Sequence, residues 1–197
     1  MDKILLIASA NKNKLKEIYN ILKNIPFKKR SLDEIKFRGH IEETGRTFRE
    51  NALLKAETVG RKTGLLTLAE DSGLEIDYLT GRPGIRSARY SPGTDRDRLN
   101  KVLEELNGVP EEKRSARFVC VAALFDPQKK RTYFFAGESR GYITEKPQGK
   151  RGFGYDPIFY NLDLKKTNAQ ATFREKNRVS HRARALFKVK EFLGDGN

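Results

Sequence analysis

Two adjacent carboxylates, Glu70 and Asp71, follow an apolar run from Leu65 to Ala69, and a serine and Gly73 come directly after them. Because an unpaired carboxylate is costly to bury, this pattern is typical of a buried strand that ends at a reactive edge. Gly73 predicts the turn by which the chain leaves that edge. Successive side chains of an extended chain point to opposite sides, so Glu70 and Asp71 are expected to have different tasks. A solvated turn at a strand end explains the same residues equally well.

A polar loop near the N-terminus, Ser9 to Lys14, contains small polar residues and two lysines. It follows a predicted buried strand over residues 3–8 and precedes a predicted helix that starts near Leu15 and stops at Pro26. Free N–H groups and the helix dipole attract anions to such a helix start. The loop is neither a Walker A loop nor a GxGxxG fingerprint. Ordinary capping of the helix by the serine or the first asparagine of the loop is the alternative.

A second carboxylate pair lies in the segment Glu42-Glu43-Thr44-Gly45, again beside a glycine. Thr47 and Glu50 then have the spacing of a capping box, which predicts a helix that runs to about Thr63. Lys55 lies near the apolar stripe of this helix, where a lysine often only extends along the apolar surface. This segment could supply oxygen ligands to a divalent metal together with the first pair.

The rest of the chain predicts a further set of elements and one irregular loop rich in glycine and aromatic residues. That loop could hold an aromatic ring against a flat ligand, but such loops are also ordinary hairpin connections. A histidine near the start of the last helix is either a solvated surface residue or a ligand. The predicted elements are a strand over 74–77, a helix over 94–106, an antiparallel hairpin over 116–125 and 131–138, a possible strand over 141–144, the loop over 152–157, and a helix over 177–193.

The bulk composition limits the class of protein. The 197 residues suit one large domain or two small lobes, and no flexible linker interrupts them. The net charge of +14 predicts attraction to polyanions such as nucleotides, although much Lys, Arg and Glu with little Gln is also a thermophile-like composition. Cys120 is the only cysteine, which predicts a core residue and a cytoplasmic protein. No apolar run approaches membrane-spanning length, and the N-terminal one is too short for a signal peptide.

Together these segments resemble the inosine triphosphate pyrophosphatase family, the Ham1-like purine nucleoside triphosphate pyrophosphatases. Each motif is weak by itself, but the set covers nearly the whole chain in the family's order. The matching motifs are Ser9–Lys14, Glu42–Gly45, Glu50–Ala52 with Lys55 and Ala56, Glu70–Leu74, Pro83–Ile85 with Ser87–Tyr90, Gly152–Phe159, and Lys176 with Ser180–Arg182.

The resemblance implies an α/β fold with two lobes around a cleft and a long curved mixed β-sheet flanked by helices. It implies one nucleoside-triphosphate pyrophosphatase domain over residues 1–197, a homodimer, and Mg²⁺ as cofactor. The implied reaction converts a purine nucleoside triphosphate and water into the monophosphate and pyrophosphate. The implied substrates are ITP, dITP and XTP, so the biological role would be to cleanse the nucleotide pool.

The resemblance also implies roles for individual residues. Asp71 would be the general base and, with Glu42, would bind the metal, and its chemistry suits both tasks. Glu70 and Lys55 are second candidates for orienting groups or for phosphate contact. The implied substrate contacts are Ser9, Ala10, Asn11, Lys12, Asn13 and Lys14 for the phosphates, Ser72, and Phe153, Gly154, Tyr155, Asp156, Lys176, His181 and Arg182 for the base. Donors from His181 and Arg182 aimed at the 6-keto oxygen would accept hypoxanthine and reject adenine.

Two other functions compete with this one. The positive charge favours a nucleic-acid-binding protein, but that class needs basic residues on one continuous face with interleaved aromatics. Here the basic residues are spread over all predicted elements, so we expect no obligate nucleic-acid partner. A pyrophosphatase for modified pyrimidines is the other competitor, and the Phe153 loop with His181 and Arg182 favours purines over it.

Overall fold

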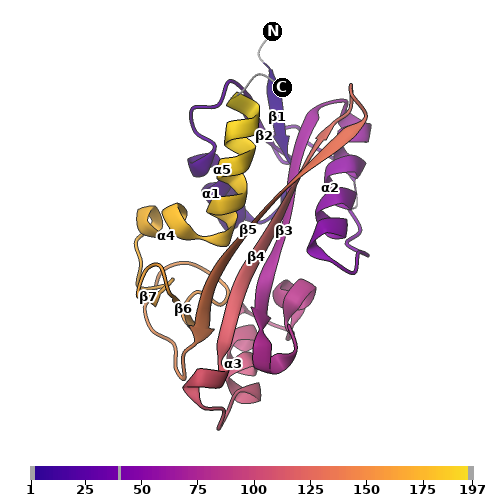
Figure 1. The fold of residues 1–197 in the computed structure, drawn as a ribbon. Helices are drawn as coiled ribbons and strands as arrows, with labels where there is room; N and C mark the ends of the chain where they lie inside the picture. Colours follow the sequence, from indigo (N-terminus) through magenta and orange to yellow (C-terminus); the bar gives the residue numbers. More distant parts are fainter. Residues whose placement is uncertain (1–2, 40, 195–197) are drawn as a thin grey trace. The chain divides into compact units, whose positions relative to one another are not determined.

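The computed structural model describes residues 3–39 and 41–194. Within these residues seven strands form one mixed sheet in the order β2-β1-β3-β4-β5-β6-β7, with helices flanking it (Figure 1). β1 (Ile4–Ile7) pairs in parallel with both β2 (Lys28–Ser31) and β3 (Leu66–Ile76). The predicted α/β class is therefore confirmed.

The remaining elements agree with most of the predicted ones. Among the described residues no helix is long and apolar enough to span a membrane. The helices are α1 (Lys12–Ile21), α2 (Phe48–Thr63), α3 (Asp95–Glu105), α4 (Phe173–Val179) and α5 (His181–Gly194), with short 3₁₀ helices at Asp77–Leu79, Gly84–Arg89 and Glu111–Lys113. The other strands are β4 (Ser115–Asp126), β5 (Arg131–Ile143), β6 (Phe159–Asn161) and β7 (Lys166–Thr167). β6 pairs antiparallel with both β5 and β7.

The chain divides into two compact units. The boundary falls inside β3, β4 and β5, and it separates Asp71 from the serine that follows it. The first unit comprises Met1–Asp71, Cys120–Gly137 and Arg182–Asn197, and the second comprises Ser72–Val119 and Glu138–His181.

Alternation along β3 organises the first unit. Leu68 packs into a core built with α1 and α5, whereas Ala69 packs into a second core built with α2. Figure 1 shows α1 and α5 on one side of this part of the sheet and α2 on the other. Since side chains alternate along a strand, the same geometry directs Glu70 toward α1 and α5 and Asp71 toward α2.

The second unit has a core of its own. Leu74 and Ile76 of β3 pack there against α3, the first half of β4, and the segment around Phe159. Phe118 contacts Phe159 edge to face, with ring centroids 4.7 Å apart. The loop of residues 152–157 adjoins this core through the buried side chain of Tyr155.

The turn expected at Gly73 is wrong, because β3 continues through it to Ile76. Leu74 and Ile76 are fully buried in the second core, and the Leu74 amide donates to Ser87 Oγ over 2.9 Å. These contacts hold the chain extended, so the carboxylate pair lies in the middle of a strand rather than at its end.

The single helix expected over 177–193 is also wrong, because the structure has two helices there. Ser180 has an extended backbone (φ −64°, ψ 154°) and separates α4 from α5. A capping box of Thr172 and Glu175 starts α4 before the predicted boundary. The break at Ser180 could not be predicted from the apolar residues of α5, because the polar residues of its first turn do not show helical spacing.

The boundaries of the two N-terminal helices were partly predicted. α1 ends at Ile21, before Pro26, and Asn24 follows with a left-handed backbone (φ 65°). α2 begins after the expected cap Thr47 and ends at Thr63, with Gly64 (φ 68°) as its C-cap. The predicted capping box is only half formed, since the carboxylate of Glu50 accepts from the Arg46 amide rather than from the cap residue.

Close packing of α2 on the sheet gives a prediction about stability. A Cβ atom at Gly60 would lie 2.4 Å from Cδ1 of the buried Phe125. We expect Gly60→Ala to lower the free energy of unfolding by about 1–3 kcal/mol through overpacking, as measured by urea titration. The exposed neighbour Lys62 is the control, and Lys62→Ala should change stability by less than about 0.5 kcal/mol. Equal effects of the two variants would contradict the packing argument.

Candidate active site

The carboxylate pair lies just beyond the end of β1. Ile7, the last residue of β1, is paired with Leu68, and the amide of Ala8 donates to the carbonyl of Leu68 over 2.8 Å. After Ala8 the chain leaves the sheet through the polar loop that begins at Ser9, while β3 continues into Glu70. The carboxyl ends of parallel strands are where open α/β sheets bind ligands.

Glu70 lies in a largely buried polar cluster, which we call the Glu70 cluster: the charged residues Glu70, Lys14, Arg182 and Glu17, and the thiol of Cys120. Glu70 is 3% exposed, and its Oε1 lies 3.0 Å from Lys14 Nζ and 3.4 Å from Arg182 Nε. Arg182 Nη1 also donates to Glu17, and Cys120 Sγ donates to Glu70 Oε2 over 3.4 Å. Burial acts to raise the pKa of Glu70, but the charges of Arg182 and Lys14 outweigh burial and hold this pKa well below its ordinary value. Glu70 therefore stays ionised.

Asp71 has different neighbours on the opposite face of β3. Its side chain accepts from Asn51 Nδ2 over 3.1 Å, and its Oδ1 lies 3.5 Å from Lys55 Nζ. Asp71 is 7% exposed, and burial, together with the nearby charge of Glu70, raises its pKa, because Lys55, Lys14 and the Asn51 amide offset these effects only in part. Asp71 is thus the better proton acceptor of the pair.

Lys55 joins Asp71 to the segment Glu42–Gly45, which precedes α2 and which we call the acidic segment. Its ammonium donates to Glu43 Oε1 over 2.8 Å, in addition to its contact with Asp71. Burial acts to lower the pKa of Lys55, but the surrounding carboxylates, Asp71 first among them, raise it. Lys55 is buried and paired, so it does more than extend along an apolar surface.

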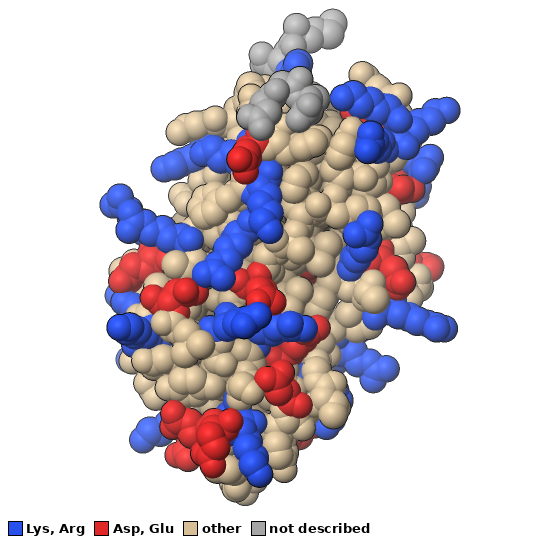
Figure 2. All heavy atoms as spheres, viewed as in Figure 1, with Lys and Arg blue, Asp and Glu red and all other residues tan. Residues whose placement is uncertain are grey.

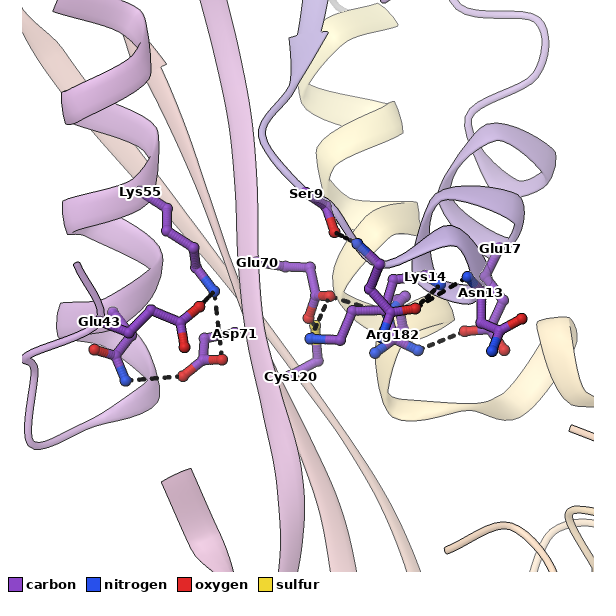
Figure 3. A network of polar contacts seen from close by, with 12 residues as sticks. Ser9, Asn13, Lys14, Glu17, Glu43, Lys55, Glu70, Asp71, Cys120 and Arg182 are labelled. Carbon is purple, nitrogen blue, oxygen red and sulfur yellow. Dashed lines mark hydrogen bonds and ion pairs between the residues drawn. The ribbon is translucent and has the colours of Figure 1, made fainter. Parts of the chain in front are cut away.

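Figure 3 shows these two environments together: Lys55 and Glu43 lie with Asp71 on one side of β3, and Lys14, Arg182 and Cys120 lie with Glu70 on the other. Two carboxylates whose surroundings shift their pKa values in opposite directions are suited to different tasks. One can hold a positive charge in place while the other takes a proton.

The polar loop at the start of α1 is partly explained by helix capping. Asn11 Oδ1 accepts from the amides of Asn13 and Lys14 over 3.0 and 3.1 Å, and Ser9 Oγ accepts from the Asn11 amide over 3.3 Å. Ala10, Asn11, Lys12 and Asn13 are exposed, so the loop is accessible to a ligand. Capping and phosphate binding are compatible here, and the predicted phosphate contacts stay a prediction.

The acidic segment was predicted to bind metal through Glu42. Glu42 and Glu43 are both exposed, but only Glu43 shares Lys55 with Asp71 among the described residues. The structure thus connects Glu43 to the catalytic candidate, and the assignment of Glu42 stays a prediction. Gly45, at the end of the segment, donates its amide to Asn51 Oδ1 over 2.8 Å.

In the second unit, Asp156 holds the predicted base-binding loop together. Its Oδ2 accepts from the Phe153 amide over 2.9 Å and from Lys176 Nζ over 2.5 Å, and its Oδ1 accepts from Asn168 Nδ2 over 3.1 Å. The Lys176 ammonium also lies 4.7 Å from the centroid of the Phe153 ring. Lys176 and Asp156 are thus brought together with Phe153, as expected for one binding element.

Two further contacts anchor the same loop. Tyr155 is buried, and its hydroxyl donates to the carbonyl of Ser87 over 2.9 Å, so its ring belongs to the core. The Gly154 amide donates to Asp95 Oδ2 over 2.8 Å. His181 is buried as well and stacks on Phe118, with ring centroids 4.7 Å apart, so the histidine is no solvated surface residue.

Sequence reasoning placed Arg182 with the base-reading residues. The structure places it in the Glu70 cluster of the first unit, 2% exposed, while His181 belongs to the second unit. Its role toward the base stays a prediction, as does that of the half-buried Ser72.

Several residues that contact the candidate site were not predicted to act in it. Asn51 and Ser87 lie inside motifs that support the family resemblance, so they could have been selected as candidates from the sequence. Glu17, Asp95 and Asn168 lie outside those motifs, and spacing alone gives no reason to select them. In the first unit these contacts come from Glu17, Glu43, Asn51 and Cys120, and in the second unit from Ser87, Asp95 and Asn168.

Comparison with known proteins identifies the family. A family model described as the Ham1 family matches residues 5–192, which is nearly the whole chain. The chain belongs to the Ham1 family. This confirms the resemblance found in the sequence motifs.

Named relatives of this Ham1-family chain align over almost their full length. A protein named dITP/XTP pyrophosphatase from Bacillus subtilis is 48% identical over 190 residues, covering 95% of this chain and 96% of the relative. Another of the same name, from Bacillus licheniformis, is 46% identical over 193 residues, covering 97% and 98%. The structure of a HAM1 protein from Coxiella burnetii matches with a TM-score of 0.90 at 40% identity, covering 98% of this chain and 100% of that one.

The Glu70 cluster generates a prediction about stability and pH. In Glu70→Gln, Arg182 and Lys14 lose a buried counter-charge, which should cost about 3 kcal/mol or more at pH 7. Because the folded pKa of Glu70 is depressed, its contribution is present above the ordinary glutamate pKa of about 4.3 and is lost as pH falls toward the folded value.

Urea unfolding of both proteins at pH 7 and at successively lower pH tests this. The difference in stability between wild type and Glu70→Gln should shrink below about pH 4. A difference that stays constant with pH would show that the ionised form of Glu70 contributes nothing.

Proposed function

We propose that this Ham1-family protein hydrolyses dITP, XTP and ITP to the nucleoside monophosphate and pyrophosphate, and so cleanses the nucleotide pool. The observation that supports this best is the carboxylate pair of β3, in which Glu70 holds Lys14 and Asp71 is a buried proton acceptor. Relatives named dITP/XTP pyrophosphatase, with near-complete alignment, supply the substrate class.

In the proposed reaction Asp71 accepts a proton from the attacking water, and the phosphoanhydride bond between the α and β phosphates breaks. The raised pKa of Asp71 brings this carboxylate closer to the basicity that proton transfer needs. Lys55, between Asp71 and Glu43, keeps a positive charge beside the reacting groups. Phosphate transfer depends mainly on such charge placement.

We propose Mg²⁺ as the cofactor, and the donor set fits this ion. Within residues 3–39 and 41–194 no group of three or more His, Cys, Asp or Glu side chains could enclose a metal. Mg²⁺ needs no such cage, since it uses one or two carboxylates and completes its shell with water and substrate phosphates. Asp71 and a glutamate of the acidic segment would hold it, and when bound it would neutralise charge on the phosphates.

The phosphates would bind at the loop from Ser9 to Lys14. This loop is exposed for most of its length and brings two lysines to the start of α1. Glu70 fixes the position of Lys14 through its ion pair, so this ammonium needs little ordering when the phosphates arrive.

The purine would bind at the loop of residues 153–156. Phe153 offers a ring, and the Lys176 ammonium, fixed by Asp156, lies near it as a donor to a 6-keto oxygen. His181 is the second proposed donor in this unit. A site built from donors leaves the 6-amino group of adenine without an acceptor, which penalises ATP.

We further propose that the protein forms a homodimer, as the family resemblance implies, and that it acts in the cytoplasm. A single buried cysteine, Cys120, agrees with a reducing compartment. The mass in solution, measured by light scattering on a size-exclusion column, checks the first of these proposals against a subunit mass of 22.5 kDa.

A phosphate-release panel tests the proposed substrate class. Purified protein, Mg²⁺ and inorganic pyrophosphatase are incubated with ITP, XTP, dITP, GTP, ATP and CTP. We expect kcat/KM for ITP, dITP and XTP to exceed that for ATP and CTP by about a hundredfold or more, as a donor–acceptor mismatch predicts. Comparable rates with ATP or CTP would reject the proposed base selection.

A gel shift, combined with the phosphate-release panel, separates this function from nucleic-acid binding. On the face shown in Figure 2, acidic side chains are interspersed among the basic ones, which does not favour a polyanion groove there. A gel shift that survives moderate salt, without hydrolysis of any nucleotide, would instead support nucleic-acid binding.

Loss of the proposed base should remove turnover without unfolding the protein. We expect Asp71→Asn to lower kcat by about 10²–10⁴-fold, because the proton acceptor is lost while the shape is kept. Steady-state kinetics with ITP measures this, and circular dichroism shows that the fold is retained. Near-normal kcat in this variant would exclude Asp71 from the mechanism.

The adjacent glutamates of the acidic segment form a matched pair for the metal proposal. Glu43 shares Lys55 with Asp71, so Glu43→Gln should raise the Mg²⁺ concentration for half-maximal rate by about tenfold or more. Glu42→Gln should change it by less than about threefold, since among the described residues Glu42, unlike Glu43, makes no contact with Lys55 or Asp71. The reverse order would assign the metal to Glu42, as the sequence resemblance implied.

A further inference from the structure

Asn51, in the first turn of α2, has a side chain with no exposed surface. Its Oδ1 accepts from the backbone amide of Gly45 over 2.8 Å, and its Nδ2 donates to Asp71 Oδ2 over 3.1 Å. One buried amide therefore touches both the acidic segment and the proposed catalytic carboxylate. None of the roles proposed above uses it.

The two partners allow only one orientation of this amide. The Gly45 N–H can only donate, and the ionised carboxylate of Asp71 can only accept. A flipped amide would oppose two donors at one end and two acceptors at the other. A buried unsatisfied group costs more than an ordinary hydrogen bond gains, so the observed orientation is fixed.

Gly45 shows how closely the acidic segment approaches the start of α2. A Cβ atom at Gly45 would lie 2.7 Å from Asn51 Oδ1, 2.7 Å from Glu50 Cβ and 2.9 Å from the Asn51 backbone nitrogen. Glycine is required here for space, since any side chain would push the segment away from the amide. The contact between Gly45 and Asn51 thus sets how far the acidic segment lies from α2.

Asp71 is held by donors on both of its oxygens. Lys55 lies at Oδ1 and Asn51 at Oδ2, so the carboxylate cannot rotate without losing one of them. A carboxylate has about four lone-pair positions, and this arrangement leaves positions free for water or metal. Asn51 differs from Lys55, which lies on the same helix, in being neutral and in having a shorter side chain.

We propose that Asn51 is a positioning residue of the reaction, whose amide fixes Asp71 and the acidic segment relative to each other. This inference rests on the proposed function, because it concerns the orientation of the proposed base. The competing explanation is packing alone, in which Asn51 only fills space at the start of α2.

Asn51→Asp separates these explanations, because aspartate keeps the shape of asparagine. An aspartate oxygen still accepts from Gly45, but its other oxygen repels Asp71 or shares a proton with it, and both outcomes weaken Asp71 as a proton acceptor. We expect kcat for ITP to fall at least tenfold, with KM changed less than threefold, and to fall further than in Asn51→Ala. Packing alone predicts the opposite order, since alanine leaves a cavity and aspartate does not.

Hydrogen exchange gives a readout that needs neither substrate nor metal. The amide of Gly45, followed in peptides that cover residues 41–48, should exchange faster in Asn51→Ala and near the wild-type rate in Asn51→Asp. Thr47→Ala is the matched control: it removes the cap of the same helix, where Thr47 Oγ1 accepts from the Glu50 amide over 3.1 Å, without touching Asp71. It should lower the melting temperature while kcat stays within twofold of wild type.

The inference is overturned if Asn51→Asp has a higher kcat than Asn51→Ala, if Thr47→Ala loses as much kcat as Asn51→Ala, or if Gly45 exchange is unchanged in Asn51→Ala. If Asn51→Asp does not fold, the kcat values of Asn51→Ala and Thr47→Ala and the Gly45 exchange rate in Asn51→Ala still test the inference. Wild-type protein that releases no pyrophosphate from any purine triphosphate would instead reject the proposed function, and the exchange result would still show whether Asn51 holds the acidic segment.

Discussion

The buried charge of Glu70 is the constraint on which the candidate site depends. A carboxylate that is 3% exposed can remain ionised only if cations compensate it, and Lys14 and Arg182 supply them from the starts of α1 and α5. These ion pairs tie both helix starts to the middle of β3. Breaking one partner would leave an uncompensated charge in a dry core, so the geometry of the loop before α1 is linked to the stability of the first unit.

Alternation along β3 then gives the two carboxylates different chemistry. Glu70 faces two cations and keeps its charge, while Asp71 faces one lysine and a neutral amide and has a raised pKa. A single residue step along one strand thus produces a structural anion and a proton acceptor. A helix could not achieve this separation as simply, because adjacent side chains there differ in direction by only about 100°.

Sequence reasoning predicted the class of fold and most elements because their signals are local. The cap at Thr47 and the stop at Gly64 are determined by a few neighbouring residues, and the opposed directions of Glu70 and Asp71 follow from strand geometry. The failures have a common physical cause. Gly73 stays extended because distant core residues bury Leu74 and Ile76, and tertiary packing of this kind overrides a local turn preference.

The difference between local signals and long-range contacts also applies to the candidate site. The motifs named Asp71, Lys55 and Asp156, but contacts that define their roles join residues 16–20 positions apart, such as Asn51 with Asp71 and Lys176 with Asp156. Spacing in the chain cannot show which of two adjacent glutamates, Glu42 or Glu43, turns toward Lys55. Nor can it show that Arg182 is enclosed by carboxylates, because its charge alone suggests a surface residue.

The two units hold different kinds of polar chemistry, and each unit supports its own within its own core. The first has paired carboxylates and lysines, in which charge compensates charge, and this suits phosphates and metal ions. The second fixes its loop through Asp156, which accepts from a backbone amide, an asparagine and Lys176, and this suits the recognition of a neutral, flat base. Because one carboxylate of the second unit satisfies three donors, Lys176 and the Phe153 amide are preorganised before any ligand arrives. Selectivity that depends on buried donors requires such preorganisation, since donors that are free to turn could adapt to either a keto or an amino group.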